Sequence, residues 1–312
     1  MNSVEISIVI PVYNSGDIIH KLYAAIAASL NEQYTFELIL VNDASKDNSW
    51  EQIKQLTIAN PFVIGVNLKK NSGQDNALLA GLRIAQGNYC VIMDDDLQHH
   101  PKYISTLHNA IVNGFDVCYA NFELKKQSVV KNTGSNLNGK MAEVLMAKPK
   151  EIYLSPFKII NKSTISEIVK FAGPYPYIDG IILSITSNIT QVEVDHHERD
   201  SGKGNYSIKR SANVFFKMFT GFSILPLRIA TITGIIATLL GVVLSFKYLY
   251  DYFFTKDYVP GWTTVVILII VFSGLILLSL GIIGEYIGRT YLAVNNKPQY
   301  SISEIVKSNT DK

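Results

Sequence analysis

Three consecutive carboxylates, Asp94, Asp95 and Asp96, form the cluster in this sequence best suited to chemistry, and Gln98 follows them closely. They come directly after the apolar run 89–93, which predicts a short buried strand. In an open α/β sheet, ligands bind outside the carboxyl ends of the strands, where this cluster would lie. Crowded carboxylates repel one another, and a divalent cation with oxygen ligands would offset that repulsion. We therefore expect a Mg²⁺ or Mn²⁺ site here rather than a solvated acidic turn.

Polar residues also follow two earlier strand-like runs. Pro11, Tyr13 and Asn14 end the run that begins at residue 6, and Asp43 follows the run 36–41. The ends of parallel strands converge on one crevice, where a carboxylate such as Asp43 can accept from a base N–H or a ribose hydroxyl. The chain has neither a Gly-x-Gly-x-x-Gly stretch nor a Gly-Lys-Ser/Thr loop, which disfavours a dinucleotide fold and a P-loop. Phosphate charge would then be met by the metal.

The elements that must position these residues alternate between strand and helix. Strands are expected at 6–12, 36–41, 62–68 and 89–93, with helices between them. This order predicts an α/β fold with a mainly parallel sheet and right-handed crossovers. A looser pattern follows, with a helix at 101–111, strands at 115–119 and 157–160, a helix at 162–171 and an edge strand at 191–196. The apolar run 178–183 fits either a helix or a strand, and the domain is expected to span residues 1–206.

The remainder of the chain is more apolar. Residues 207–224 predict an amphipathic helix that lies in a membrane interface, although an ordinary packing helix would show the same pattern. Residues 229–250 and 263–283 are each long enough to span a bilayer, which takes about 20 residues. Glycines at 234, 241, 274 and 281 would let these two helices pack closely. Lys and Arg gather outside the hairpin, so both termini, including a tail at 291–312, are expected in the cytoplasm.

Composition excludes several classes of protein. A net charge of +2 argues against a nucleic-acid-binding protein. The two cysteines, Cys90 and Cys118, have no metal-ligand spacing and indicate a reducing compartment. The amino terminus, residues 1–5, has neither a basic n-region nor a long apolar h-region, so no signal peptide is expected.

The strand-end residues and the apolar carboxyl-terminal part described above resemble a known family, the GT-A glycosyltransferases of family 2. The resemblance is to the polyisoprenyl-phosphate branch, which includes dolichol-phosphate mannose synthases and bacterial undecaprenyl-phosphate sugar transferases. The matching stretches keep their order over nearly the whole chain: 8–14, 41–45, 71–81, 93–98, 197–207, 226–228 and 284–289. The last of them, Gly-Glu-Tyr-Ile-Gly-Arg after a two-helix hairpin, is the most specific.

The resemblance implies a role for each group of residues. Asp94, Asp96 and Gln98 would serve the metal and the diphosphate, with Asp96 as the central catalytic group. The nucleotide would be held by residues at the strand ends and in the turns beside them: Pro11, Tyr13, Asn14, Asp43, Gln74, Asp94 and Asp95. The acceptor site is expected from the residues themselves, because a lipid phosphate must be met near the membrane surface. Basic and phenolic groups lie just before the amphipathic helix and in the basic loop 121–140, which could close over the same place: Arg199, Lys203, Tyr206 and Lys131.

Two departures from the family pattern concern catalysis. Ser15 stands where the family often has Glu, and residues 152–156 lack the Asp that many members carry as a proposed base. Asp179 is a possible substitute base, but a helix cap or surface acid is the commoner role for such a residue. A base is dispensable for a lipid phosphate, whose second pKa near about 6 leaves it mostly dianionic at neutral pH.

The expected protein is therefore a multi-pass enzyme of the bacterial inner membrane with its catalytic domain in the cytoplasm. It would transfer one sugar from a nucleotide sugar to undecaprenyl phosphate, with inversion at the anomeric carbon. The nucleotide is expected to be UDP, and GDP is an open alternative. A homo-oligomer is also possible. Two other functions compete: a processive polysaccharide synthase and an inactive sugar-nucleotide-binding scaffold. The first would carry Gln-x-x-Arg-Trp, yet neither Trp50 nor Trp262 follows an arginine. The second would show a degraded acidic cluster.

Overall fold

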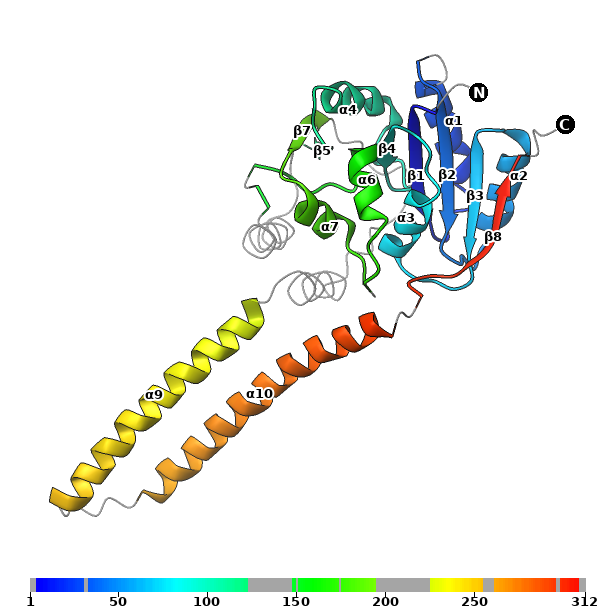
Figure 1. Cartoon of the computed structure of the whole chain (residues 1–312). Coiled ribbons are helices and arrows are strands. Elements are labelled where there is room, and N and C mark those ends of the chain that lie inside the picture. Colours follow the sequence, from blue (N-terminus) through cyan, green and yellow to red (C-terminus); the bar gives the residue numbers. More distant parts are fainter. Residues whose placement is uncertain are drawn as a thin grey trace. The chain divides into compact units, whose positions relative to one another are not determined.

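The described residues form one eight-stranded sheet, around which the helices of the first unit pack (Figure 1). The computed structural model describes residues 4–30, 33–122, 148–149, 151–173, 175–194, 225–254, 261–295 and 298–308. It divides into two compact units, one formed by residues 1–215 together with 296–312, the other by residues 216–295. The first unit contains the sheet, and the second contains two long helices.

The first unit begins with the predicted alternation of strands and helices. Its elements are β1 (Ile6–Val12), α1 (Ile19–Leu30), β2 (Phe36–Asn42), α2 (Ser49–Ala59), β3 (Val63–Leu68), α3 (Gln74–Leu82) and β4 (Tyr89–Ile92). There follow the short 3₁₀ turn Pro101–Tyr103, α4 (Ile104–Ile111), β5 (Val117–Phe122), β6 (Lys158–Asn161), α6 (Lys162–Ile168), α7 (Ile178–Ile185) and β7 (Ile189–Val194). The ambiguous run at 178–183 is thus helical, and the expected edge strand is β7.

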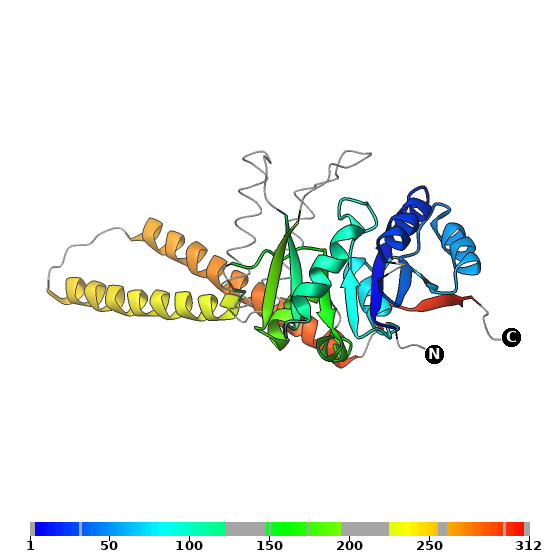
Figure 2. The same ribbon diagram turned by 90° about the horizontal axis from the view of Figure 1, so that it is seen from above.

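The strand order is β7-β5-β6-β4-β1-β2-β3-β8. The central strands β4, β1, β2 and β3 are parallel, while β6 runs antiparallel to both β4 and β5. Since β1 to β3 progress outward in one direction and β4 returns to the other side of β1, α1 and α2 cover one face and α3 covers the opposite one (Figures 1 and 2). The mainly parallel α/β fold expected from the sequence is confirmed.

The central strands are buried on both faces, as their continuous apolar sequence predicts. In β1, Ile6, Ile8 and Ile10 have no solvent exposure, and the β2 residues Leu38 and Leu40 pack in the same core. On the other face, α3 lies close to the sheet at Gly81, where an added Cβ would approach Val9 Cγ1 to 2.4 Å. The rigid sheet therefore fixes the loops that leave its carboxyl edge.

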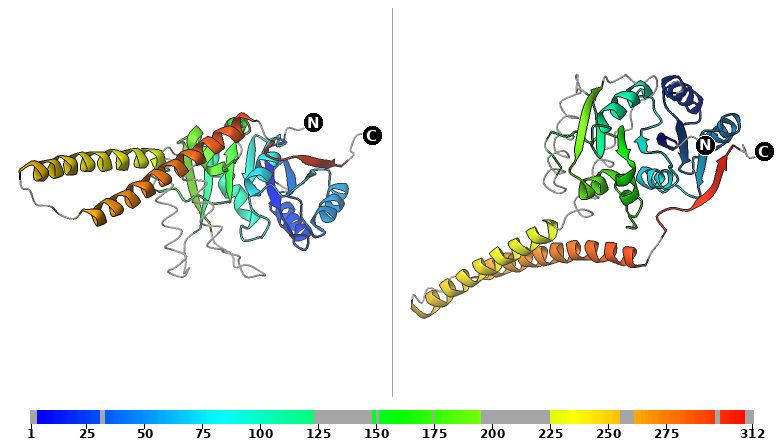
Figure 3. Two further views of the ribbon diagram at one scale, coloured as in Figure 1. Left: turned by 90° about the horizontal axis from the view of Figure 1, so that it is seen from below. Right: turned by 45° about the horizontal axis from the view of Figure 1, so that its top comes forward.

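The C-terminal segment returns to this sheet. Strand β8 (Ile302–Lys307) pairs antiparallel with β3 and forms the outer edge of the sheet, shown in red in Figure 3. Before it, Arg83 donates to the Tyr300 hydroxyl at 2.8 Å, and Gln299 Nε2 donates to the Gly173 carbonyl at 2.6 Å. The segment expected as a tail is thus part of the sheet-containing unit.

The second unit contains α9 (Leu225–Phe254) and α10 (Trp262–Val294). The windows 227–244 and 271–294 are long and apolar enough to cross a membrane, by length and composition, and neither is buried inside the protein. Two expectations need correction. A Cβ added at Gly234, Gly241, Gly274 or Gly281 meets nothing within 4 Å, so these glycines do not mark a close helix contact. Residues 284–289 lie inside α10 rather than after the hairpin.

Candidate active site at the carboxyl edge of the sheet

The carboxyl edge of the sheet contains all the non-glycine residues with positive φ in the described part of the chain. Asn14, Ala44 and Leu97 have φ values of 54°, 52° and 57°, and they follow β1, β2 and β4 respectively. A left-handed conformation costs a non-glycine residue roughly 1–2 kcal/mol, and such strain is concentrated at functional sites. The backbone is therefore bent at three neighbouring strand ends, where the sequence predicts the site.

The loops after β1 and β2 are joined by hydrogen bonds. The Asn14 amide donates to Ser45 Oγ at 3.0 Å, and Asn14 Oδ1 accepts from the Lys46 amide at 2.8 Å. Asp47 adds a further link because its Oδ2 accepts from the Gly16 amide at 3.0 Å. These contacts make one preorganised wall from two loops, with the Tyr13 side chain 46% exposed beside it.

Asp43 is buried and fixes the turn that leads into α3. Its two carboxylate oxygens accept from the Ser72 and Gly73 amides at 2.6 and 2.9 Å. Gly73 has a φ of 90°, which a residue with a Cβ adopts only with strain. Each carboxylate oxygen has a second lone pair, so this role is compatible with the predicted contact to a nucleotide. Asp43 thereby connects the end of β2 to Gln74, the first residue of α3.

The three acidic residues after β4 have different surroundings. Asp94 Oδ1 accepts from the side-chain nitrogen Nε2 of Gln74 at 2.7 Å, and Asp96 Oδ1 accepts from the backbone amide of Gln98 at 3.1 Å. Burial raises the pKa of Asp95, and the charge of Asp96 adds to that effect. Hydrogen bonds from the Ser15 side chain and the Tyr13 backbone oppose it, so Ser15 connects the first loop to the acidic cluster.

The acidic cluster fits a cation that a substrate shares. Within the described residues, no group of three or more His, Cys, Asp or Glu side chains is placed to hold a metal ion. The half-buried carboxylates of Asp94 and Asp96 offer oxygen atoms as metal ligands, and the Gln98 side chain could add its amide oxygen. Mg²⁺ is usually bound through one or two carboxylates together with water and substrate phosphates, and this donor set suits that mode.

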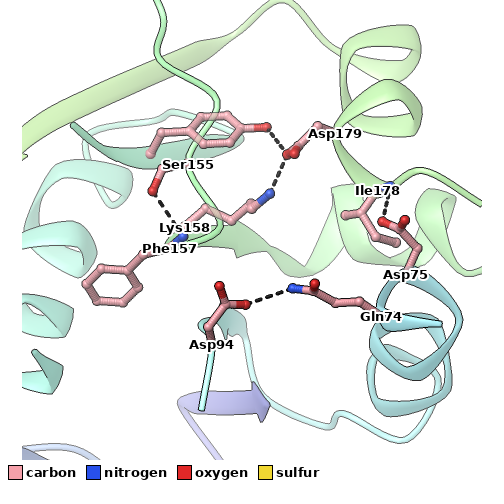
Figure 4. A network of polar contacts seen from close by, with 9 residues as sticks. Gln74, Asp75, Asp94, Ser155, Phe157, Lys158, Ile178 and Asp179 are labelled. Carbon is pink, nitrogen blue, oxygen red and sulfur yellow. Dashed lines mark hydrogen bonds and ion pairs between the residues drawn. The ribbon is translucent and has the colours of Figure 1, made fainter. Parts of the chain in front are cut away.

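A second charged group lies on the strand beside the acidic cluster. Lys158 on β6 forms an ion pair with Asp179 on α7, and the Tyr119 hydroxyl of β5 donates to the same Asp179 oxygen, Oδ1, at 2.8 Å. Lys158 is paired in the sheet with Ile92, two residues before Asp94. Figure 4 shows Lys158 and Gln74 extending in opposite directions, toward Asp179 and Asp94 respectively. Asp179 is therefore neither a helix cap nor a lone surface acid.

Lys158 is the residue that sequence reasoning missed. A lysine within an apolar strand, here Phe157-Lys158-Ile159, was the available signal, because a buried lysine needs a partner. In the segment 152–156, which lacks the family acid, Ser155 is fully buried and its Oγ accepts from the backbone amide of Phe157 at 3.1 Å. Four predicted acceptor residues, Arg199, Lys203, Tyr206 and Lys131, lie outside the described residues, as does the amphipathic helix 207–224.

Comparison with known proteins now decides the family. Residues 7–173, more than half of the chain, match the family Glycosyl transferase family 2. The chain belongs to glycosyl transferase family 2. Among relatives in this family, the uncharacterized glycosyltransferase YkcC of Bacillus subtilis is 30% identical over 96% of this chain and 94% of its own length. The undecaprenyl-phosphate 4-deoxy-4-formamido-L-arabinose transferase of Aeromonas hydrophila is 29% identical over 99% of this chain and 97% of its own.

The fold of this family member also matches solved structures. Glucosyl-3-phosphoglycerate synthase from Mycobacterium tuberculosis, in complex with Mn²⁺, UDP-glucose and phosphoglyceric acid, aligns with a TM-score of 0.50 and 16% identity. The alignment covers 69% of this chain and 78% of that one. The GT-A-like fold expected from the sequence is thereby confirmed, as is the family expected from its motifs.

Proposed function

We propose that this family 2 glycosyltransferase transfers a single sugar from a nucleotide sugar to a polyprenyl phosphate such as undecaprenyl phosphate. The acidic cluster at the carboxyl edge of the sheet carries the proposal, because it offers oxygen ligands for a metal–diphosphate at the end of β4. The named transferase from Aeromonas hydrophila, matched over nearly the full length of both chains, supports the lipid-phosphate acceptor.

The donor would lie along the ends of β1, β2 and β4. Pro11, Tyr13 and Asn14 and the buried Asp43 would hold the nucleoside, with Gln74 and Asp95 supporting the loops around it. Asp94 and Asp96, with Gln98, would hold a Mg²⁺ or Mn²⁺ ion, which supplies charge stabilisation for the departing nucleoside diphosphate. The synthase from Mycobacterium tuberculosis, solved with Mn²⁺ and UDP-glucose, supports this class of donor and ion.

The acceptor needs a position and charge balance more than it needs a base. A phosphomonoester is mostly dianionic at neutral pH, so its oxygen is already a nucleophile. In-line attack on the anomeric carbon would invert its configuration while the diphosphate leaves. Arg199, Lys203, Tyr206 and Lys131 remain the proposed contacts to the acceptor phosphate, because guanidinium and ammonium groups pair well with phosphate.

The connectivity supports a membrane hairpin with both ends on one side. The chain leaves the sheet-containing unit before α9 and returns to it after α10, where β8 pairs with β3. In a membrane both ends of the hairpin would then lie on the side of that unit, in agreement with the Lys and Arg asymmetry of the sequence. The apolar surfaces of α9 and α10 would be covered by lipid, since the exposed residues include Leu239, Leu277 and Ile276.

The proposal is tested by incubating membranes that contain the protein with a panel of nucleotide sugars and undecaprenyl phosphate, followed by mass spectrometry of the extracted lipid. One sugar per lipid phosphate is expected, with one donor of the panel preferred. Chains of several sugars would favour the processive synthase. Absence of any product with every donor, although the protein is folded, would favour the scaffold.

The membrane arrangement is tested by single cysteines at Thr255, between the two helices, and at Ser308, just after β8. In intact cells an impermeant thiol reagent should label the cysteine at 255 and not the one at 308. Equal labelling of both sites from outside would contradict the hairpin.

A further inference from the structure

The contacts of Asp179 indicate what this carboxylate can bind. Both donors that hold it, the Lys158 ammonium and the Tyr119 hydroxyl, use Oδ1, so neither uses Oδ2. The Asp179 side chain is 16% exposed while that of Lys158 is only 3% exposed. The carboxylate is therefore fixed through one oxygen and can still be approached by a ligand.

The surroundings keep Oδ1 an acceptor. Burial raises the pKa of Tyr119 well above its ordinary value, and the charge of Asp179 raises it further, so the phenol stays a proton donor. The Lys158 ammonium lies 5.1 Å from the centre of the Tyr119 ring, which adds a cation–π contact. Lys158 and Tyr119 together restrict Asp179 to one orientation.

The position of Asp179 relative to the acidic cluster is set by two consecutive residues of α3. Gln74 donates to Asp94, and Asp75 Oδ1 accepts from the amide of Ile178, the residue before Asp179 (Figure 4). The nucleoside would lie over the ends of β1 and β2, on one side of β4, whereas Lys158, which holds Asp179, is on β6 at the other side of β4. A diphosphate bound at Asp94 and Asp96 would then present to Asp179 the group on the phosphate away from the nucleoside. In a nucleotide sugar, that group is the sugar.

We infer that Asp179 is a sugar-binding residue, whose Oδ2 accepts a hydrogen bond from a hydroxyl or amino group of the donor sugar, with Lys158 and Tyr119 as positioning residues. The inference rests on the proposed function. A carboxylate favours hydroxyl and amino donors and repels phosphate, which assigns it to the sugar rather than to the acceptor phosphate. A dianionic acceptor has no proton for Asp179 to remove, so binding accounts for the residue better than general-base catalysis does.

The test compares each donor with its own nucleoside diphosphate, which lacks only the sugar. Calorimetry on the full-length protein in detergent would measure both affinities for the wild type, Asp179→Ala and Asp179→Asn. Losing a hydrogen bond to a charged group should weaken nucleotide-sugar binding about 10- to 100-fold in Asp179→Ala. The amide of Asp179→Asn should cause a smaller loss. Nucleoside diphosphate binding should change by less than about twofold in both.

The positioning residues are tested by coupling to Asp179. Tyr119→Phe should weaken nucleotide-sugar binding in the wild-type background and cause no further loss when combined with Asp179→Ala, because the two act as one unit. Lys158→Met should behave in the same way if it folds, and Tyr119→Phe carries the test if it does not. Glu167→Gln and Lys170→Met, which break the exposed ion pair of α6, serve as matched controls and should change neither affinity.

Three results would overturn the inference. Asp179→Ala could bind nucleotide sugar as tightly as the wild type, could lose both ligands equally, or could lower kcat with donor affinity unchanged, which would make Asp179 a base. A wild-type protein that binds no nucleotide sugar of the panel would overturn the proposed function as well. If the wild type binds and only the Asp179 comparison fails, the proposed function stands and this inference does not.

Discussion

The two edges of the central sheet each bury a carboxylate among polar partners, but we propose a ligand site at the carboxyl edge alone. At the amino edge, Glu37 is 5% exposed and its Oε1 accepts from the Ser7 hydroxyl and the Gln86 amide, each at 2.6 Å. Ser7 Oγ in turn accepts from the Gly87 amide at 2.8 Å. The partners of Glu37 close the network within the protein, and none of the described non-glycine residues with positive φ lies there.

The carboxyl edge differs in charge, strain and exposure. It gathers Asp94, Asp95 and Asp96 beside strained backbone at Asn14, Ala44 and Leu97. Like charges and left-handed residues cost stability there, whereas the hydrogen bonds of Glu37 stabilise the amino edge. The comparison teaches that burial of an acid does not identify a site by itself, and that clustered acids next to strained backbone distinguish the candidate site from the closed network of Glu37.

The largest expected effect is on catalysis at the carboxyl edge. Asp96→Asn should lower the rate of sugar transfer by roughly 10²-fold or more, because a ligand for the metal–diphosphate is lost. Folding should be intact, since the Asp96 side chain accepts from the Gln98 amide and an amide oxygen can replace it there. The rate would be measured with purified protein across a range of Mn²⁺ concentrations. Near-normal activity with unchanged metal dependence would remove Asp96 from the site.

The matched change at the amino edge should have the opposite signature. Glu37→Ala leaves the Ser7 hydroxyl and the Gln86 amide without their acceptor, which should lower the free energy of unfolding by about 2–4 kcal/mol. The transfer rate per folded molecule should stay within about twofold of the wild type. Thermal unfolding followed through the fluorescence of buried Trp50 would report the loss. A stable but inactive Glu37→Ala protein would break the distinction between the two edges.

Asp95 provides a smaller test that depends on pH. Its pKa is raised in the folded state, so the ionised carboxylate destabilises the fold. The free energy of unfolding therefore falls as the pH rises from the ordinary pKa of Asp towards the raised one. Asp95→Asn removes the charge and keeps an oxygen that can accept from Ser15 and the Tyr13 backbone. The melting temperature of the variant relative to the wild type should therefore be higher near about pH 7 than near about pH 4. A difference that is constant with pH would mean that Asp95 is not destabilised by its charge.

The smallest expected effect concerns backbone strain. Ala44→Gly relieves a left-handed residue, and the gain of roughly 1 kcal/mol is partly offset by the greater entropy of glycine in the unfolded chain. Stability should be equal to or slightly above that of the wild type. The control is Ala24→Gly at an exposed position within α1, which should lose about 1 kcal/mol. Equal losses in both variants would argue that Ala44 is not strained.

The sequence predicts those parts of the molecule whose signals are local. Strands β1 to β4 are covered on both faces, so their apolar runs are continuous and easy to recognise. The acidic cluster directly follows one of them and is therefore placed with it. Asp43, Gln74 and Asp94 come together as expected because parallel strands bring their carboxyl ends to one edge.

The features that escaped prediction depend on pairing between distant residues. Lys158 and Asp179 are on different elements, and the sequence of the strand 157–160 does not indicate which acidic residue pairs with its lysine. Strand β8 pairs with β3 at the edge of the described sheet, and most of its residues are exposed, with only Ile302 and Val306 partly buried. Its sequence therefore resembles a solvated tail. Glycines in α9 and α10 follow a packing pattern, yet the space beside them is open, because small residues permit a close contact without requiring one.

The most direct test of the central claim follows labelled sugar from its nucleotide donor into lipid with the purified full-length protein. Polyprenyl phosphate and polyprenol, which differ only in the phosphate, would be offered in parallel detergent solutions with Mn²⁺ or Mg²⁺. The proposed function predicts one labelled sugar per polyprenyl phosphate and no product with polyprenol. At a temperature where both variants are folded, Asp96→Asn should lose the product and Glu37→Ala should keep it. Label that appears in a polymer, or in polyprenol as readily as in its phosphate, would contradict it.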